Sequence, residues 1–370
     1  MLTSVAATPN KSNAVFKSRH WLVIRDYIIG WVIAFFFIGI VRGVGTQELG
    51  ALRFDFWSTF FITLSMAPLL GLITGYLQVM LEERFYKRIS LLRFLLYRLL
   101  YMVGLIIFIF VLAFAVYSAL FGLEVSFYAF VIEDAGSRVI YFYVLVVDFM
   151  LSLLRQINLM LGQGNLWRLL KGQFYTPKVA KKVFMFLDLQ SSTTIAEQIG
   201  HIRYSQLIQD CLYDLGVVGN YKAEIYQYVG DEAVLTWPAE AGISNQNCLR
   251  AFYAFKHTLT QKADYYQQKY QWVPFFKAGV HVGEVTVTEV GKYKREIAYH
   301  GDTINTAARI QGQCNALGQD LLLSAQLADA LSSTDGPYQF SPIGSVPLKG
   351  KQQPVTICTV AAASGNPTTS

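Results

Sequence analysis

Two aspartates, each close to the end of a short apolar run, are the residues of this chain with the clearest chemical potential. Asp188 ends the run that begins at Val183, and Asp231 follows a Val-Gly pair after another strand-like run. Carboxylate oxygens are the ligands that hard divalent cations prefer. Ser192 and Thr193 come just after Asp188, where the free N–H groups of a new helix would suit phosphate. The pattern predicts a divalent-metal site that holds a polyphosphate.

Each aspartate alone also has a structural explanation. Asp188 could cap the helix that follows it, and Asp231 stands in a tight turn, where aspartate is common for conformational reasons. On neighbouring strand ends, however, two unpaired carboxylates repel each other, and a bound cation is the simplest remedy. Their placement in the sheet therefore decides between the two interpretations.

A third segment, His300 to Gln311, opens a helix with an amide and a guanidinium on one face. Asn305 and Arg309 are four residues apart, and such residues are neighbours on a helix surface. The pair suits ribose and phosphate, although a surface helix with a salt bridge is the alternative. Lys349, in an ordinary-looking Lys-Gly-Lys turn, adds a cation for a terminal phosphate.

The second half of the chain has the alternation of strands and helices of an α+β domain. We expect strands at 183–189, 224–228, 233–237, 275–281, 285–290 and 297–299, and helices at 192–216, 245–270 and 303–316, followed by shorter strands and a closing hairpin. This βαββαβ order predicts a ferredoxin-like sheet in which the first and third strands are neighbours. Asp188 and Asp231 would then lie side by side.

The first half has a different composition. The whole chain is 53% hydrophobic and only 15% charged, with a mean hydropathy of +0.35. Four apolar spans, at 21–41, 57–81, 99–120 and 139–161, are each about long enough to cross a lipid bilayer as a helix. Buried helices of a soluble protein would instead need amphipathic faces, and Phe35–Val41 and Leu105–Phe114 are apolar all round. We expect an α-helical membrane domain of four transmembrane helices.

Lys and Arg gather before the first span, between the second and third, and after the fourth. The positive-inside bias then places both termini and the soluble half in the cytoplasm, on a multi-pass protein of the cell (inner) membrane. The same distribution explains the net charge of +6 without nucleic-acid binding. The four cysteines show no metal or disulfide spacing, which fits a reducing compartment.

The expected organisation is a disordered N-terminus (1–20), a membrane domain (21–161), a basic and partly helical connector (162–182), a catalytic domain (183–362) and a disordered tail (363–370). Asp148 lies inside the fourth span, where a carboxylate is either functional or a packing contact. As a functional group it would pair with an arginine such as Arg98 or contact a ligand, and the packing contact is favoured.

Four motifs stand in one order: Phe186-Leu-Asp188 with Ser192-Thr193, Val229-Gly-Asp231, Ala278–Glu284, and Asn305–Ile310. Together they resemble the class III nucleotidyl cyclase catalytic domain, over about residues 181–362. The apolar half is similar only in architecture to the anchors of bacterial members.

The resemblance implies a head-to-tail homodimer with active sites at the subunit interface. One subunit would hold two Mg²⁺ or Mn²⁺ ions through Asp188, Asp231 and the Leu189 carbonyl. The other would use Asn305 to orient the ribose and Arg309 to stabilise charge on the α-phosphate. The ribose 3′-hydroxyl attacks that phosphate and pyrophosphate leaves. Lys349, or less well Lys351, resembles the lysine that holds the β- and γ-phosphates.

Two positions depart from the family's base-reading pattern. Gln227 replaces the lysine of well-studied adenylate cyclases, and Ala298 replaces its partner aspartate. Neither matches the pattern of guanylate cyclases, so ATP is favoured only by its frequency as the substrate in bacteria. A guanylate cyclase, and a membrane receptor whose domain only binds nucleotide, remain alternatives. A diguanylate cyclase is disfavoured by Val229 and by the Asn305/Arg309 helix.

Overall fold

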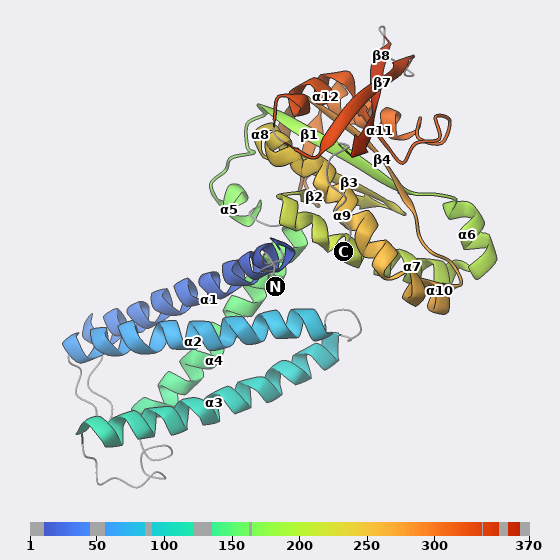
Figure 1. The fold of residues 1–370 in the computed structure, drawn as a ribbon. Helices are drawn as coiled ribbons and strands as arrows, with labels where there is room; N and C mark the ends of the chain where they lie inside the picture. Colours follow the sequence, from blue (N-terminus) through green and yellow to red (C-terminus); the bar gives the residue numbers. More distant parts are fainter. Residues whose placement is uncertain are drawn as a thin grey trace, which may run out of the picture. The chain divides into compact units, whose positions relative to one another are not determined.

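The computed structural model describes residues 11–44, 56–85, 91–121, 135–162, 165–334, 336–347 and 354–362. The chain divides into two compact units, Met1–Leu159 and Met160–Ser370 (Figure 1). Residues 1–10 and 363–370, where disorder was expected, lie outside the described residues. Lys349 and Lys351 also lie outside them.

The N-terminal unit is made of long helices. They are α1 (Lys11–Val44), α2 (Phe56–Phe85), α3 (Leu91–Phe121) and α4 (Ala135–Leu161). In the described residues, three stretches are long and apolar enough to cross a membrane: His20–Val41, Leu64–Glu82 and Val139–Leu161. The apolar stretch of α3, Leu96–Leu112, is shorter. A membrane-spanning architecture is thus supported for three helices, and the fourth span stays a prediction.

One expectation for this unit is wrong. Helix α1 already begins at Lys11, so residues 11–20 are helical and not disordered. The i to i−4 backbone ladder of the apolar span continues into this polar stretch, since the ladder itself needs no apolar side chains.

Asp148 has the partner that the sequence suggested. Its carboxylate is fully buried and lies 2.9 Å from the guanidinium of Arg98. Arg98 also donates to Gln78 of α2 over 2.7 Å, and Glu82 of α2 pairs with Arg155 of α4. These contacts tie α2, α3 and α4 together and favour a packing role for Asp148.

The C-terminal unit is built on one mixed sheet. Its helices are α5 (Asn165–Leu170), α6 (Ser192–Ile199), α7 (His201–Asp214), α8 (Ala239–Ile243), α9 (Asn247–Gln261), α10 (Ala263–Tyr270), α11 (Asp302–Gln311) and α12 (Ala325–Ser332), with short 3₁₀ helices η2 (Leu215–Tyr221) and η3 (Ser244–Gln246). Its strands are β1 (Lys178–Leu189), β2 (Glu224–Val229), β3 (Glu232–Pro238), β4 (Phe276–Val290), β5 (Glu296–His300), β6 (Leu321–Ser324), β7 (Tyr338–Val346) and β8 (Val355–Ala362).

The strand order is β2-β3-β1-β4-β6-β8-β7, and β5 pairs with β4. The first four strands have the ferredoxin-like order that the βαββαβ pattern predicts, and the expected pairing of the first and third strands is confirmed because β1 is antiparallel to β3. The main core lies on one face, beneath α7, α9, α10 and α12. A smaller apolar cluster on the other face packs against α11 and β5.

Several element boundaries differ from the expectation. The segment 275–290 is one continuous strand, β4, without the predicted break. Strand β1 begins at Lys178 because β4 is long enough for its Val287 to pair with Lys178. Part of the expected connector is therefore sheet, and its helical part is α5. The two long helices divide near Gly200 and Lys262, and α11 ends at Gln311.

Candidate active site

The sheet brings the two aspartates together. Leu187 is paired with Ala233 across the β1–β3 ladder, so Asp188, one residue later, reaches the hairpin turn that carries Asp231. This turn needs glycine at its first central position. Gly230 has a φ of 65°, the left-handed region that glycine adopts without strain, as two-residue hairpins require. The predicted neighbourhood of the carboxylates is therefore present within one chain.

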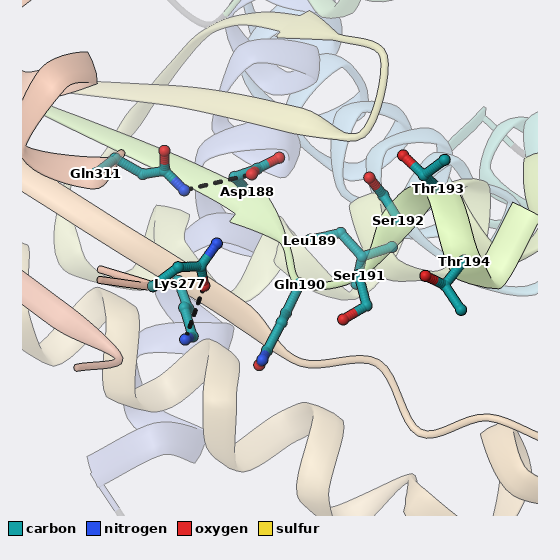
Figure 2. Close-up of a pocket in the computed structure, with 10 residues that line it drawn as sticks. Asp188, Leu189, Gln190, Ser191, Ser192, Thr193, Thr194, Lys277 and Gln311 are labelled. Carbon is teal, nitrogen blue, oxygen red and sulfur yellow. Dashed lines mark hydrogen bonds between the residues drawn. The ribbon is translucent and has the colours of Figure 1, made fainter. Parts of the chain in front are cut away.

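A cavity of about 330 Å³ opens beside Asp188. Its lining residues are Asp188, Leu189, Gln190, Ser191, Ser192, Thr193, Thr194, Lys277, Gln311 and Asn315. Figure 2 shows the first residues of α6 on one side of this cavity and the Gln311–Asp188 contact on the other. The predicted phosphate-binding residues Ser192 and Thr193 are thus placed beside the carboxylate.

The carboxylates of the hairpin turn and of Asp188 create an unfavourable concentration of negative charge. Burial, and then the Asp231 charge, raises the pKa of Asp188, whereas hydrogen bonds from Gln311 and the Leu189 backbone lower it. Burial, together with Asp188 and Asp231, raises the pKa of Glu232 to about 7. The Oδ2 atom of Asp231 is buried without a hydrogen-bond partner. Each observation calls for a positive charge at this place.

These residues fit divalent metal. Among the described residues, no three His, Cys, Asp or Glu side chains gather as a metal-binding group. Two carboxylates that repel each other, one with an oxygen lacking a partner, nevertheless supply the hard oxygen ligands that Mg²⁺ and Mn²⁺ use. Leu189 is buried and is one of the residues that line the cavity. Asp188, Asp231 and the Leu189 carbonyl remain the residues that would hold the ions.

Helix α11 presents different residues on its two sides. At its end, the Gln311 amide donates to Asp188 over 3.4 Å. Gly279 of β4 permits this close approach, since a Cβ there would collide with the Gln311 backbone. At about 100° per residue, Asn305 lies roughly 120° and Arg309 roughly 160° around the helix from Gln311. Neither lines the cavity.

Asn305 is exposed, and Arg309 is only loosely paired with Asp302, at 3.8 Å. One guanidinium nitrogen of Arg309, Nη1, is buried and has no hydrogen-bond partner. A single chain therefore brings Asp188 and Asp231 together but directs Asn305 and Arg309 away from the cavity.

The two base-reading positions lie on two strands of one chain, β2 and β5, that are not paired with each other in the sheet. Gln227 is exposed on β2, and Ala298 is half-buried on β5. The residues next to them, Tyr226 and Tyr299, are in edge-to-face contact with ring centroids 4.8 Å apart. The strands that carry the two positions are thus held together by an aromatic contact.

Sequence reasoning missed four residues of this site: Lys277, Asn315, Glu232 and Tyr204. Lys277 lies directly opposite Asp188 in the β1–β4 ladder and lines the cavity, where its Nζ donates to Asn315 over 2.9 Å. Glu232 and Tyr204 adjoin the two aspartates, and burial followed by the Asp231 charge raises the pKa of Tyr204 to about 12. The pairing register of the first and fourth strands, which sets Asp188 opposite Lys277, is the signal that would have identified the lysine.

Residues 175–360 match the family model described as adenylate and guanylate cyclase catalytic domain. The chain belongs to this family. The resemblance noted from the four motifs is thereby confirmed. Adenylate cyclase 2 of Rhizobium meliloti (strain 1021) is 32% identical over 209 residues, which cover 55% of this chain and 56% of that protein. Adenylate cyclase 1 of the same organism is 26% identical over 180 residues, 47% of this chain and 26% of that protein. The chain therefore spans less than two thirds of these relatives.

Solved structures with a similar fold include a bacterial light-regulated adenylyl cyclase, with a TM-score of 0.48 and 18% identity over 58% of this chain and 64% of that one. The adenylyl cyclase CyaB from P. aeruginosa has a TM-score of 0.45 and 17% identity over 51% of this chain and 97% of that one. Both scores are below 0.5, so the family assignment rests on the sequence match.

Proposed function

We propose that the chain is a membrane-anchored adenylate cyclase that converts ATP to cyclic AMP and pyrophosphate as a homodimer. One observation carries the proposal: Asp188, which adjoins Asp231 of the β2–β3 turn, lines a cavity together with the start of α6, whereas Asn305 and Arg309 do not line it. Because one chain separates these two sets, a second copy in head-to-tail orientation is the simplest way to complete the site. The division into a membrane domain (21–161), a connector and a catalytic domain remains part of this proposal, with the sheet of the catalytic domain beginning at Lys178.

The residues of one subunit bind the triphosphate. The N–H groups and hydroxyls of Ser192 and Thr193 suit phosphate oxygens, and Lys277 supplies a cation at the same cavity. Asp188, Asp231 and the Leu189 carbonyl would hold two Mg²⁺ or Mn²⁺ ions. When bound, these ions would acidify the 3′-hydroxyl and neutralise phosphate charge. The family's use of divalent metal supports this assignment.

The second subunit orients the reacting groups. Its Asn305 hydrogen-bonds the ribose, so that the 3′-hydroxyl points at the α-phosphate, and its Arg309 donates to the oxygens on which charge develops. The buried Nη1 atom of Arg309 that has no hydrogen-bond partner is suited to this role. Lys349 of the same subunit is the expected contact for the β- and γ-phosphates.

The base preference rests on the 32% identical relative named adenylate cyclase. Gln227 can pair with adenine through its amide, and Ala298 offers only its backbone. The three apolar stretches and the distribution of Lys and Arg support a multi-pass inner-membrane location with the C-terminal unit in the cytoplasm.

The test is turnover by the purified full-length protein with Mn²⁺ and either ATP or GTP, followed by measurement of cyclic product and pyrophosphate. Cyclic AMP from ATP is expected, and Asp188→Ala should abolish it without loss of the fold. Cyclic GMP alone would overturn the adenylate assignment. The absence of product from both nucleotides would favour a receptor that only binds nucleotide.

A further inference from the structure

A chain of contacts connects the segment before the sheet to the two base-reading positions. Arg168 of α5 lies 3.1 Å from one carboxylate oxygen of Glu224, at the start of β2. The other oxygen of Glu224 lies 3.5 Å from the Nζ atom of Lys182 on β1. One carboxylate thus holds two cations, one at each oxygen. Its side chain is 28% exposed and that of Lys182 is 9% exposed, so these charges are less screened than a surface pair.

The contacts continue from Lys182 into an aromatic cluster. The Lys182 Nζ atom lies 4.8 Å from the centre of the Tyr299 ring, within the range of a cation–π interaction. Tyr299 packs edge-on against Tyr226 and against the buried Phe184. The Tyr226 hydroxyl also receives a backbone hydrogen bond from Tyr299. Tyr226 directly precedes Gln227, and Tyr299 directly follows Ala298.

Strand β2 needs this support because its own ladder is irregular at this point. Ile225 pairs with Leu235 and Gln227 pairs with Val234, so Tyr226 has no partner across the β2–β3 ladder. Strand β2 is also an edge strand. A bulged residue at an edge is positioned by side-chain contacts more than by backbone pairing, and here those contacts are made by Tyr299.

We propose that Arg168, Glu224, Lys182, Tyr226 and Tyr299 form a positioning network that fixes the spacing of Gln227 and Ala298, and hence the fit of the nucleotide base. None of the five lines the cavity beside Asp188 or belongs to the residues proposed to hold metal, ribose or phosphate. Arg168 neutralises Glu224 from the α5 side, Glu224 holds Lys182 against Tyr299, and Tyr299 holds the bulge of β2. The inference rests on the proposed nucleotide substrate.

The direction of the effect follows from what each change removes. Arg168→Gln keeps a polar side chain at a partly exposed position but removes one of the two positive charges that pair with the Glu224 carboxylate. Tyr226→Phe keeps the ring packing and loses only the hydroxyl link to Tyr299. Both changes loosen the base-reading strands and leave Asp188, Asp231, Asn305 and Arg309 untouched. They should therefore weaken base binding and spare the chemical step.

The experiment measures kcat, KM and the ATP/GTP preference of the full-length protein with Mn²⁺. Arg168→Gln and Tyr226→Phe are expected to raise the KM for ATP roughly three- to tenfold with kcat within about twofold, and to reduce the ATP/GTP ratio of kcat/KM. Arg168→Lys should recover part of the loss. The matched control is Arg203→Gln, an exposed arginine of α7 that donates to the Lys269 carbonyl, which should leave all three quantities unchanged.

Unchanged KM and base preference in Arg168→Gln would overturn the proposal. A fall in kcat together with a lower melting temperature, at constant KM, would show a merely structural role and would also overturn it. If the wild type made no cyclic product from either nucleotide, the proposed function would fail. Affinity for a non-cyclising ATP analogue would then decide the inference, with weaker binding by Arg168→Gln supporting it and equal binding overturning it.

Discussion

The two units of this chain bury carboxylates in different electrostatic surroundings. In the N-terminal unit, the buried Asp148 lies 2.9 Å from Arg98, and Glu82 lies 2.9 Å from Arg155. In the C-terminal unit, Asp188 and Asp231 lie beside each other, and the charge of Asp231 adds to burial in raising the pKa of Asp188. The first arrangement is neutral by itself, whereas the second carries an excess of negative charge that a bound cation would offset. The comparison separates charges that hold helices together from charges that serve a ligand.

The largest expected effect comes from removing a charge of the second kind. Asp188→Asn should lower turnover on the order of 1,000-fold or more, since loss of a metal ligand removes several kcal/mol of transition-state stabilisation. Stability at neutral pH should be unchanged or higher. Because the folded-state pKa of Asp188 is raised, its ionised form destabilises the fold, and an uncharged amide relieves this. Cyclase assays and thermal unfolding measure the two effects, and loss of both activity and stability would contradict the assignment.

Removing a charge of the first kind should have the opposite pattern. Asp148→Leu leaves the Arg98 guanidinium buried without its carboxylate, which should lower the unfolding free energy of the N-terminal unit by about 3 kcal/mol. The control is the double change Arg98→Met with Asp148→Leu, which removes both charges and should restore most of that loss. Thermal unfolding in detergent micelles measures both. Equal stability of the single and double variants would show that the pair does not hold the helices.

A smaller effect is expected from a paired carboxylate of the C-terminal unit. Burial alone would raise the pKa of Asp210, but hydrogen bonds from Lys269, Tyr270 and Tyr265 lower it overall. An acid with a lowered folded-state pKa contributes stability that is complete above its unfolded value and is lost as pH falls through the folded value. Asp210→Asn should therefore cost about 1 kcal/mol at pH 7, and the difference from wild type should shrink below about pH 4. Urea unfolding across pH measures this, and a constant difference would contradict it.

Local patterns were enough to predict much of the fold and half of the site. The strand ends at Asp188 and Asp231, the tight Gly230 turn and the polar start of α6 are encoded in adjacent residues. The pairing of Asp148 with Arg98 followed from the cost of burying a lone charge. Family membership, predicted from four short motifs, is confirmed by the match over residues 175–360.

The remaining features depend on contacts between distant segments. Strand β1 extends to Lys178 only because β4 continues beside it, and β4 lacks the break that was expected between residues 281 and 285. Lys277 enters the site through its register opposite Asp188, 89 positions earlier in the chain. The ion pair between Arg168 and Glu224 joins α5, in the segment expected to be a connector, to the edge strand β2. Sequence spacing carries no information on such registers, so tertiary pairing decides them.

The most direct test of the shared site mixes two inactive variants of the full-length protein. Asp188→Ala removes a carboxylate and Asn305→Ala removes the ribose contact, and each alone should be inactive. In a mixed dimer, one of the two sites contains neither change. Equal mixing should therefore restore about a quarter of wild-type cyclic AMP production, since half of the dimers are mixed and each has one intact site. No recovery by folded, subunit-exchanging variants would contradict a site that two chains share.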